Sequence, residues 1–206
     1  CSSASSSTSI TVNQNPTANA GDVMSAICQG ATSAVMNGIT AGGATGGTWS
    51  GGAGSWTNAT DVANATYTAG ASESGSITLT LTTTGSSCTA VTATKNITVN
   101  ANPTASASTS TGTVCEDATI SLTGGASGGS GGGYSYSWSG PSSYSSSDQS
   151  PTISSDATTA MAGSYLLTVT DGNTCSSASS STSITVNQNP TASASTSTGT
   201  VCEDAT

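Results

Sequence analysis

The sequence predicts an all-β protein made of tandem immunoglobulin-like β-sandwich repeats of 87 residues, each closed by one disulfide. Three observations lead to this prediction. Short runs in which Ile, Val and Leu alternate with Thr and Ser are bounded by Gly, Asn, Asp and Pro, which is the pattern of strands and turns. Two series of cysteines each recur every 87 residues, and long segments of sequence recur unchanged in the same register.

The internal repeat sets the domain boundaries. Residues 1–18 recur unchanged as residues 175–192, and residues 102–119 recur as residues 189–206. Taking each Asn-Pro-Thr-Ala as the start of a unit, we expect two whole repeats between two partial ones. The expected segments are 1–14, the C-terminal strand of a truncated repeat; 15–101, repeat A; 102–188, repeat B; and 189–206, the N-terminal part of a further truncated repeat.

Repeat B contains enough short apolar runs for a sandwich. Its alternating residues, for example Tyr165, Leu167 and Val169, place one apolar face on each run, and that face is expected to pack on a partner sheet. Repeat A has matching late strands around Leu79 and Ile97. The strands expected in repeat B are residues 104–109, 118–123, 134–139, 151–154, 164–170 and 181–187.

The aromatic residues fit an immunoglobulin-like core. Trp49 and Trp138 fall in the third-strand position, where a buried tryptophan anchors such sandwiches. Tyr165, at the start of a late strand, is predicted to form a tyrosine corner, in which its hydroxyl bonds to the backbone upstream. Trp56 lies in a glycine-rich stretch and is the candidate for stacking on a sugar.

The cysteines predict a disulfide in each whole repeat. The simplest pairing joins Cys28 to Cys88 and Cys115 to Cys175, each across 60 residues, and leaves Cys1 and Cys202 without partners. These bridges would staple one end of each sandwich and would require an oxidising compartment. Free thiols or a zinc site are the alternatives, although zinc is disfavoured because the chain has no His and no CxxC motif.

The charge balance excludes several classes of function. The chain has ten acidic residues, one Lys, no Arg and no His, with a formal net charge of −9. Without imidazole it has no ordinary general base near neutral pH, so we expect no enzyme and no cofactor. We expect no nucleic-acid partner and no membrane insertion, because such a chain cannot neutralise phosphates and has no apolar run of spanning length. Any export signal is expected outside this sequence.

Two kinds of modification or binding site have candidates. Three Asn-X-Thr sequons make covalent glycans possible at Asn58, Asn64 and Asn96. We expect no bound metal; if calcium were bound, the Cys115–Cys175 bridge would bring its ligands to one end of the sandwich. Those candidate calcium ligands are Glu116, Asp117 and Asp171, the last of which begins an Asp-Gly-Asn turn.

Residues 102–188, with the motifs VCEDATISLTG, YSYSWSGP and AGSYLLTVTDGNTC in order, resemble the Ig-like or PKD-like tandem repeats of large secreted surface proteins and gliding-motility adhesins of Bacteroidetes. Residues 15–101, with GGTWSGGAGSW and GSITLTLTTTGSSC, are similar to a sister repeat of those proteins. The resemblance implies a secreted or cell-surface protein with an adhesive, matrix or filament role.

The predicted function is therefore that of a structural repeat region of an extracellular fibre or cell-surface adhesin, acting as a rigid elongated spacer or filament. The expected partners are copies of itself in a filament, or neighbouring repeats of the same chain. The alternative is a carbohydrate- or cell-surface-binding module that uses loops at one end of the sandwich. A carboxylate-based hydrolase is a third class, but no acidic pair such as Asp148 and Asp156 has a motif around it.

Overall fold

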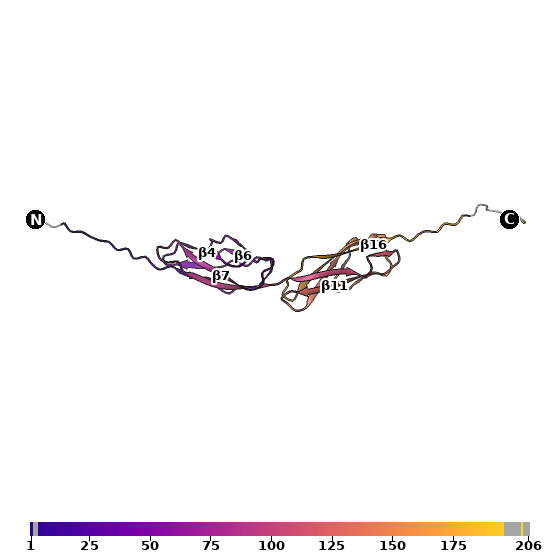
Figure 1. The fold of residues 1–206 in the computed structure, drawn as a ribbon, viewed down its shortest axis with the longest axis horizontal. Helices are drawn as coiled ribbons and strands as arrows, with labels where there is room; N and C mark the ends of the chain where they lie inside the picture. Colours follow the sequence, from indigo (N-terminus) through magenta and orange to yellow (C-terminus); the bar gives the residue numbers. More distant parts are fainter. Residues whose placement is uncertain (2–3, 196–202, 204–206) are drawn as a thin grey trace. The chain divides into compact units, whose positions relative to one another are not determined.

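The computed structural model describes residues 1, 4–195 and 203, and Figure 1 shows the path of the chain. The predicted all-β class is confirmed: the described residues form strands and two single-turn 3-10 helices. The chain divides into two compact units. Unit 1 comprises the described residues of 1–104, 126–135 and 169–178, and unit 2 those of 105–125, 136–168 and 179–206.

Two sets of eight strands follow one another along the chain. In residues 15–101 they are β1 (Thr17–Asn19), β2 (Ile27–Cys28), β3 (Ile39–Ala41), β4 (Gly46–Ser50), β5 (Ser55–Thr57), β6 (Thr66–Thr68), β7 (Gly75–Thr84) and β8 (Thr92–Asn100). In residues 102–188 they are β9 (Pro103–Thr109), β10 (Thr113–Cys115), β11 (Ile120–Gly128), β12 (Tyr134–Ser139), β13 (Ser145–Ser146), β14 (Thr152–Ser154), β15 (Gly163–Asp171) and β16 (Ser180–Asn187), with helices η1 (Pro141–Ser143) and η2 (Thr159–Met161).

The strands of residues 15–101 surround one apolar core. The largest sheet has the order β2-β8-β7-β4, and the pairs β1-β3 and β5-β6 complete the layers. Alternation along β7 and β8 buries every second residue, which is why Thr occupies most of the outward positions. The core residues are Ala20, Met36, Trp49, Ala65, Tyr67, Ala69, Leu79, Leu81, Ile97 and Val99.

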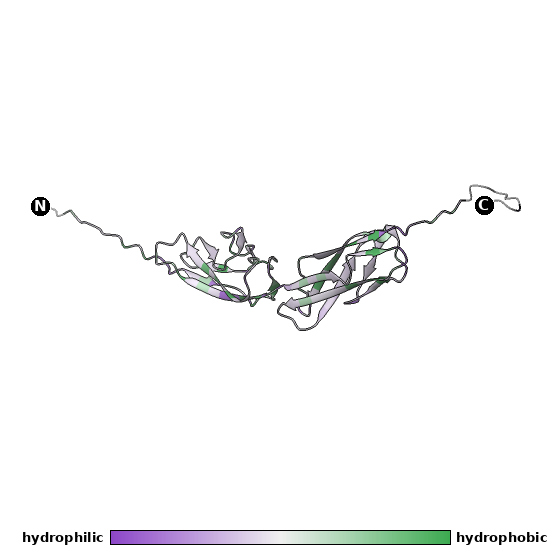
Figure 2. Ribbon diagram, turned by 45° about the vertical axis from the view of Figure 1, so that its right-hand side comes forward, coloured by the Kyte–Doolittle hydropathy of each residue, from purple (hydrophilic) through white to green (hydrophobic). Residues whose placement is uncertain are grey.

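The strands of residues 102–188 form two sheets, of order β10-β16-β15-β12-β13 and β14-β11-β9. A five-stranded sheet with strands of the G, F and C type beside a sheet of the A, B and E type is the arrangement of an immunoglobulin-like sandwich. The six predicted strands are all present, within a few residues at their ends. Figure 2 shows hydrophobic residues (green) concentrated on these strands. The buried apolar residues here include Ile120, Leu122, Trp138, Tyr165, Leu167, Ile184 and Val186.

The structure confirms the roles predicted for the core aromatic residues. Trp49 and Trp138 are 2% and 1% exposed. The hydroxyl of Tyr165 donates a hydrogen bond to the carbonyl oxygen of Met161 at 2.8 Å, four residues upstream. This is the tyrosine corner, and it fixes the chain where it enters β15.

Two short strands that the sequence pattern did not reveal, β2 and β10, occupy matching places. Each runs parallel to the last strand of its set, with Cys28 beside Asn100 and Cys115 beside Asn187. Strands of two or three residues have too few positions to show alternation, so periodicity cannot detect them. As a result, Cys28 lies beside the C-terminal end of β8, and Cys115 lies beside the C-terminal end of β16.

One sequence adopts two structures in this chain. Residues 180–187 form β16 and bury Ile184 and Val186, whereas the identical segment at residues 6–13 forms no strand. There the equivalent residues, Ile10 and Val12, are 87% and 89% exposed. Because a strand of this kind cannot bury a face alone, the difference follows from the presence or absence of a neighbouring strand.

Candidate functional site

The predicted disulfide pairing is wrong. The structure joins Cys28 to Cys175, with an S–S distance of 1.96 Å and a Cα–Cα distance of 5.5 Å. Cys88 and Cys115, the partners expected within each repeat, carry free thiols. Cys202 lies outside the described residues. The bond therefore connects repeat A with repeat B, and both of its cysteines belong to unit 1.

Strand geometry explains why the bond within a repeat does not form. Cys28 pairs with Asn100 at the end of β8, whereas Cys88 precedes Thr92 at its beginning. The nine residues of β8 separate these two ends by about 26 Å, and a disulfide needs Cα atoms within about 7 Å of each other. The same relation holds between Cys115 and Cys175 at the two ends of β16.

Hydrogen bonds from the segment between β8 and β9 lie next to the disulfide. The backbone N–H of Asn102 donates to Gln29 Oε1 at 2.9 Å, and Asn102 Nδ2 donates to the Gln29 carbonyl oxygen at 3.3 Å. The N–H of Gln29 donates in turn to the carbonyl oxygen of Asn100 at 3.0 Å. The N–H of Ala101 bonds to Ser130 Oγ at 2.7 Å. We call this set of contacts, together with the disulfide, the joint.

The carboxylate of Asp171 organises the loop that carries Cys175. Its Oδ1 accepts hydrogen bonds from the N–H groups of Asn173 and Cys175, both at 3.0 Å. Its Oδ2 accepts from the N–H groups of Ser130 and Gly131, at 3.1 and 3.2 Å. Burial alone would raise the pKa of Asp171, but these four backbone hydrogen bonds hold it below its ordinary value. One buried carboxylate thus ties together the two loops of repeat B that lie at the joint.

The turn predicted at Asp171 is present, with one difference. The N–H of Thr174 donates to the Asp171 carbonyl oxygen at 3.0 Å, which closes a β-turn. The positive φ of this region, 64°, is adopted by Thr174, although Gly172 and Asn173 tolerate such an angle more easily. The Asp171 side chain, which bonds two N–H groups of the turn, holds this conformation.

Replacing Asp171 by Asn is expected to lower the melting temperature at neutral pH, and to lower it less as the solution becomes acidic. Because the folded-state pKa lies below the ordinary value of 3.8, the carboxylate stabilises the fold fully above that value. Its contribution is lost as the pH falls through the folded-state pKa. Melting curves recorded from about pH 7 to about pH 2 measure the difference between the two proteins. Asp156→Asn, at an exposed position, is the matched control. A difference for Asp171→Asn that stays constant with pH would contradict this role.

The structure removes the reason for expecting a calcium site at Glu116, Asp117 and Asp171. It required a Cys115–Cys175 bridge to bring Glu116 and Asp117 towards Asp171, and that bridge is not formed. Glu116 Oε2 and Asp117 Oδ2 instead accept hydrogen bonds from the backbone and side chain of Asn189, at 3.2 and 3.0 Å. Within the residues that the structure describes, no three acidic, His or Cys side chains are grouped as metal ligands.

The three sequon asparagines are all exposed. Asn58 lies in the turn after β5 with a φ of 54°. The Nδ2 of Asn64, the atom a glycan would modify, donates to both carboxylate oxygens of Asp61, at 3.3 and 3.2 Å. Asn96 Oδ1 accepts from Thr78 Oγ1 at 2.9 Å, which leaves its Nδ2 outside that contact. Glycosylation stays a prediction at these positions.

Trp56, the candidate for sugar stacking, packs on other aromatic rings. Its ring lies 5.9 Å from that of Trp49 with an interplanar angle of 16°, and 5.1 Å from that of Tyr67. Its Nε1 donates to the Gly51 carbonyl oxygen at 3.1 Å. One ring face is thus covered by Trp49, so the side chain extends the core to the surface.

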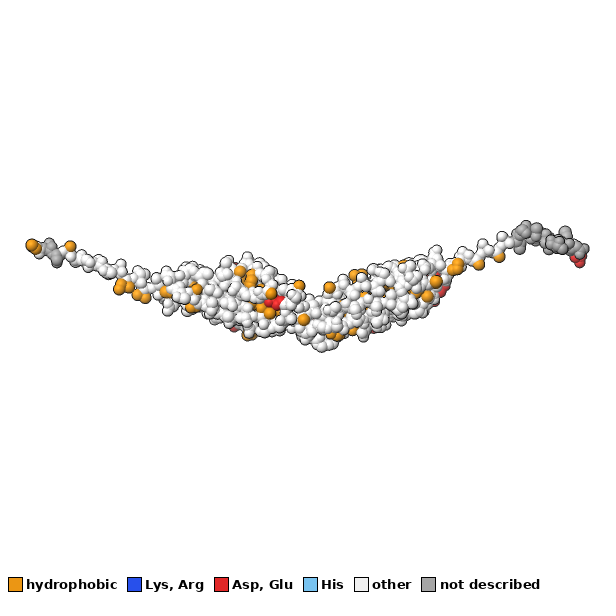
Figure 3. All heavy atoms as spheres, in the orientation of Figure 1, with side chains coloured by type: hydrophobic (Ala, Val, Ile, Leu, Met, Phe, Trp, Pro, Cys, Tyr) orange, Lys and Arg blue, Asp and Glu red, His pale blue; other side chains and the backbone are white. Residues whose placement is uncertain are grey.

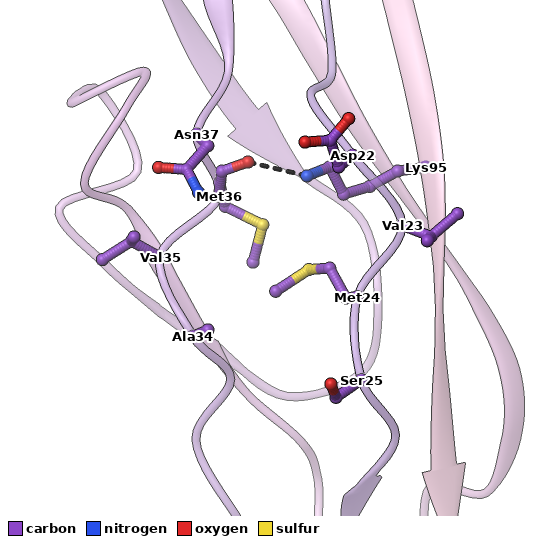
Figure 4. Close-up of a pocket in the computed structure, with 9 residues that line it drawn as sticks. All are labelled: Asp22, Val23, Met24, Ser25, Ala34, Val35, Met36, Asn37 and Lys95. Carbon is purple, nitrogen blue, oxygen red and sulfur yellow. Dashed lines mark hydrogen bonds between the residues drawn. The ribbon is translucent and has the colours of Figure 1, made fainter.

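A small pocket of about 160 Å³ surrounds the only basic side chain of the sequence, and Figure 4 shows its lining. Lys95 Nζ donates to the Met36 carbonyl oxygen at 2.6 Å and lies 5.5 Å from the centre of the Trp49 ring. Burial lowers the pKa of Lys95, and the nearby carboxylate of Asp22 opposes this effect. These contacts show that the ammonium group is used to hold the 34–37 segment against the sheet.

The matches with known proteins are solved structures of low sequence identity. No protein family and no curated protein matches the chain. The chain is similar to a three-immunoglobulin fragment of titin (16% identity over 86% of this chain and 67% of that one, TM-score 0.39). It is also similar to the fibronectin(III)-like modules of Clostridium thermocellum CbhA (14%, 84% and 95%, TM-score 0.35) and to the amphioxus IgVJ-C2 molecule (16%, 78% and 99%, TM-score 0.37). Among the described residues no helix is long and apolar enough to cross a membrane.

Proposed function

We propose that this chain belongs to the structural repeat region of an extracellular fibre or cell-surface adhesin, in which immunoglobulin-like repeats of 87 residues act as a rigid spacer. The observation that carries the proposal is the disulfide between Cys28 of repeat A and Cys175 of repeat B. A bond within one repeat would stabilise that repeat alone. A bond between successive repeats transmits tension from one to the next and restricts their movement.

The shortness of the connection supports a stiff spacer. Only Ala101 and Asn102 lie between β8 and β9, and Pro103 begins β9. The N–H groups of both connecting residues are hydrogen bonded, to Ser130 and Gln29 respectively. Short, hydrogen-bonded connections that are followed directly by proline allow less swivelling than the flexible linkers of independent domains.

The surface supports a spacer in preference to a charged binding module. The single basic side chain, Lys95, is 9% exposed, and the sequence has no Arg or His. On the face seen in Figure 3, most atoms belong to uncharged polar side chains or backbone. Such a surface lacks the basic groups that bind phosphates and acidic polymers.

The disulfide also bears on the compartment. Disulfides of this kind form and persist in oxidising surroundings, such as the outside of a cell, and are rare in reducing ones. Because the bond lies in the joint, we propose that the array acquires its stiffness only after export.

Stretching single molecules between their termini tests the proposal. In the oxidised chain the segment between Cys28 and Cys175, 147 residues apart, is bypassed by the disulfide and cannot extend under load. Adding a reductant is expected to release up to about 500 Å of further contour length, at about 3.4 Å per residue. Cys115→Ser, which removes an exposed free thiol, is the control and is expected to behave as the wild type.

If the oxidised chain extends to its full contour length, the disulfide does not carry load and the spacer function is wrong. The same conclusion follows if reduction leaves the extension unchanged.

A further inference from the structure

We infer that the Cys28–Cys175 bond is one rung of a staggered ladder, in which the cysteine at the end of the short strand of each repeat binds the loop cysteine of the next repeat. Cys115 and Cys88 are then unfilled halves of identical rungs, and the partner of each is a cysteine in a further copy of this repeat. The inference rests on the proposed function, because it extends the same joint along an array.

The cysteine positions follow one rule. Cys28 and Cys115 have the same place in successive repeats, and so do Cys88 and Cys175, with 87 residues between the members of each pair. The observed bond joins a member of the first series to the member of the second that lies 147 residues later. Under this rule Cys115 needs a partner 147 residues further on, and Cys88 needs one 147 residues earlier. Both positions fall outside the 206 residues, so the rule leaves these two thiols free.

The contacts that surround Cys28 in the complete joint are already formed around its equivalent, Cys115. In the complete joint, Gln29 follows Cys28 and accepts two hydrogen bonds from Asn102. At the second position Glu116 follows Cys115, and the N–H and Nδ2 of Asn189 donate to Glu116 Oε2 and to its carbonyl oxygen, at 3.2 and 3.3 Å.

The segments that follow Cys28 and Cys115 therefore make the same backbone hydrogen bonds. The N–H of Glu116 donates to the carbonyl oxygen of Asn187 at 2.9 Å, as that of Gln29 donates to Asn100 at 3.0 Å. Cys115 is exposed beside these contacts, in the place that Cys28 occupies when bonded.

Cys88, the equivalent of Cys175, lies beside the residues that would form the other side of a joint. Its Sγ lies 3.8 Å from the carbonyl oxygen of Asn13, the residue equivalent to Asn100 in the complete joint. Cys88 lines an open groove with Pro16 and Val91. Asn15, equivalent to Asn102, also lines this groove and is exposed.

The bond requires an oxidant, which we identify by class as a disulfide, either that of a thiol–disulfide oxidoreductase or oxidised glutathione. One thiolate attacks the oxidant's disulfide to give a mixed disulfide and one released thiol. The second protein thiolate then displaces the other oxidant thiol and forms the new S–S bond. Two protein thiols are oxidised, and one oxidant disulfide is reduced to two thiols.

A chain extended by one repeat tests the ladder. A copy of residues 102–188 is placed after residue 188, followed by the natural residues 189–206. The copy carries two mass labels at exposed positions, Ala178→Thr beside its loop cysteine and Thr119→Ser beside its short-strand cysteine, so that neither cysteine peptide of the copy is mistaken for that of Cys115 or Cys175. After oxidation by oxidised glutathione, non-reducing peptide mapping is expected to link Cys115 to the labelled peptide of the copy. The existing chain is the matched control, and alkylation is expected to modify Cys115 there and not in the extended chain.

A link between Cys115 and the unlabelled Cys175 peptide would overturn the ladder, and so would a Cys115 that stays open to alkylation. The Cys28–Cys175 bond, mapped in the same sample, reports that the extended chain has folded. The stretching experiment uses the existing chain alone, so a failed ladder with a load-bearing first disulfide would leave the spacer function standing.

Discussion

Cys28→Ser is expected to lower the free energy of unfolding by up to about 5 kcal/mol. The bond closes a loop between residues 147 apart, and the entropy that such a crosslink removes from the unfolded chain grows with loop length. The substitution also removes the partner of Cys175, which is fully buried, and leaves a thiol there. Urea denaturation followed by far-UV circular dichroism measures the loss.

Cys115→Ser is the matched control, because Cys115 has the same position in repeat B but is exposed and free. It is expected to leave the denaturation midpoint unchanged. Reducing the wild type should reproduce the loss seen with Cys28→Ser. Equal midpoints for the two serine variants would contradict a stabilising bond at Cys28.

Trp49→Ala is expected to cost about 3 to 5 kcal/mol, the range for truncating a large buried aromatic residue. Trp49 is 2% exposed, its Nε1 donates to the Val62 carbonyl oxygen at 2.9 Å, and its ring contacts both Trp56 and Lys95. The substitution would open a cavity among packed core side chains, which can collapse into it only in part. Urea denaturation followed by circular dichroism is again the measurement.

Trp56→Ala is the control for Trp49→Ala, because it removes the same ring from the partly exposed side of the stack. Its cost is expected to be clearly smaller, since less apolar surface is buried there. A loss from Trp56→Ala as large as that from Trp49→Ala would show that the stack, and not the buried position, determines the stability.

Most of the fold was predictable from the sequence, because alternation and turn residues report directly on half-buried strands. Residues 164–170 were expected to form a strand that buries Tyr165, Leu167 and Val169, and β15 buries all three. The tyrosine corner followed from the same strand. The two shortest strands, β2 and β10, escaped detection because they have no period to detect.

The pairing of the cysteines was mispredicted for a reason of strand direction. The equal separations of 60 residues suggested a bridge within each repeat, from the residue before one strand to the residue after a later one. In the structure β10 runs parallel to β16, and β15 runs antiparallel to it, so Cys115 and Cys175 lie at opposite ends of the sheet. Counting strand directions through an immunoglobulin-like topology is the signal that could have revealed the joint between repeats.

The role of Asp171 could not be predicted, because it depends on contacts distant in sequence. The Asp-Gly-Asn motif indicates a turn, but two of the four N–H groups that the carboxylate binds come from the 130–131 segment, about 40 residues away. Identical sequences at residues 4–14 and 178–188 likewise fold differently. The local pattern therefore indicates that a strand can form, and the presence of a neighbouring strand determines whether it does.

The most direct test of this account is the disulfide connectivity of the existing chain. Digestion without reduction, by a protease that does not require basic residues, yields different peptides around Cys28, Cys88 and Cys175, which mass spectrometry can tell apart. The account predicts a linked pair that contains Cys28 and Cys175, with Cys88 and Cys115 recovered as thiols. A link between Cys28 and Cys88, or between Cys115 and Cys175, would contradict it.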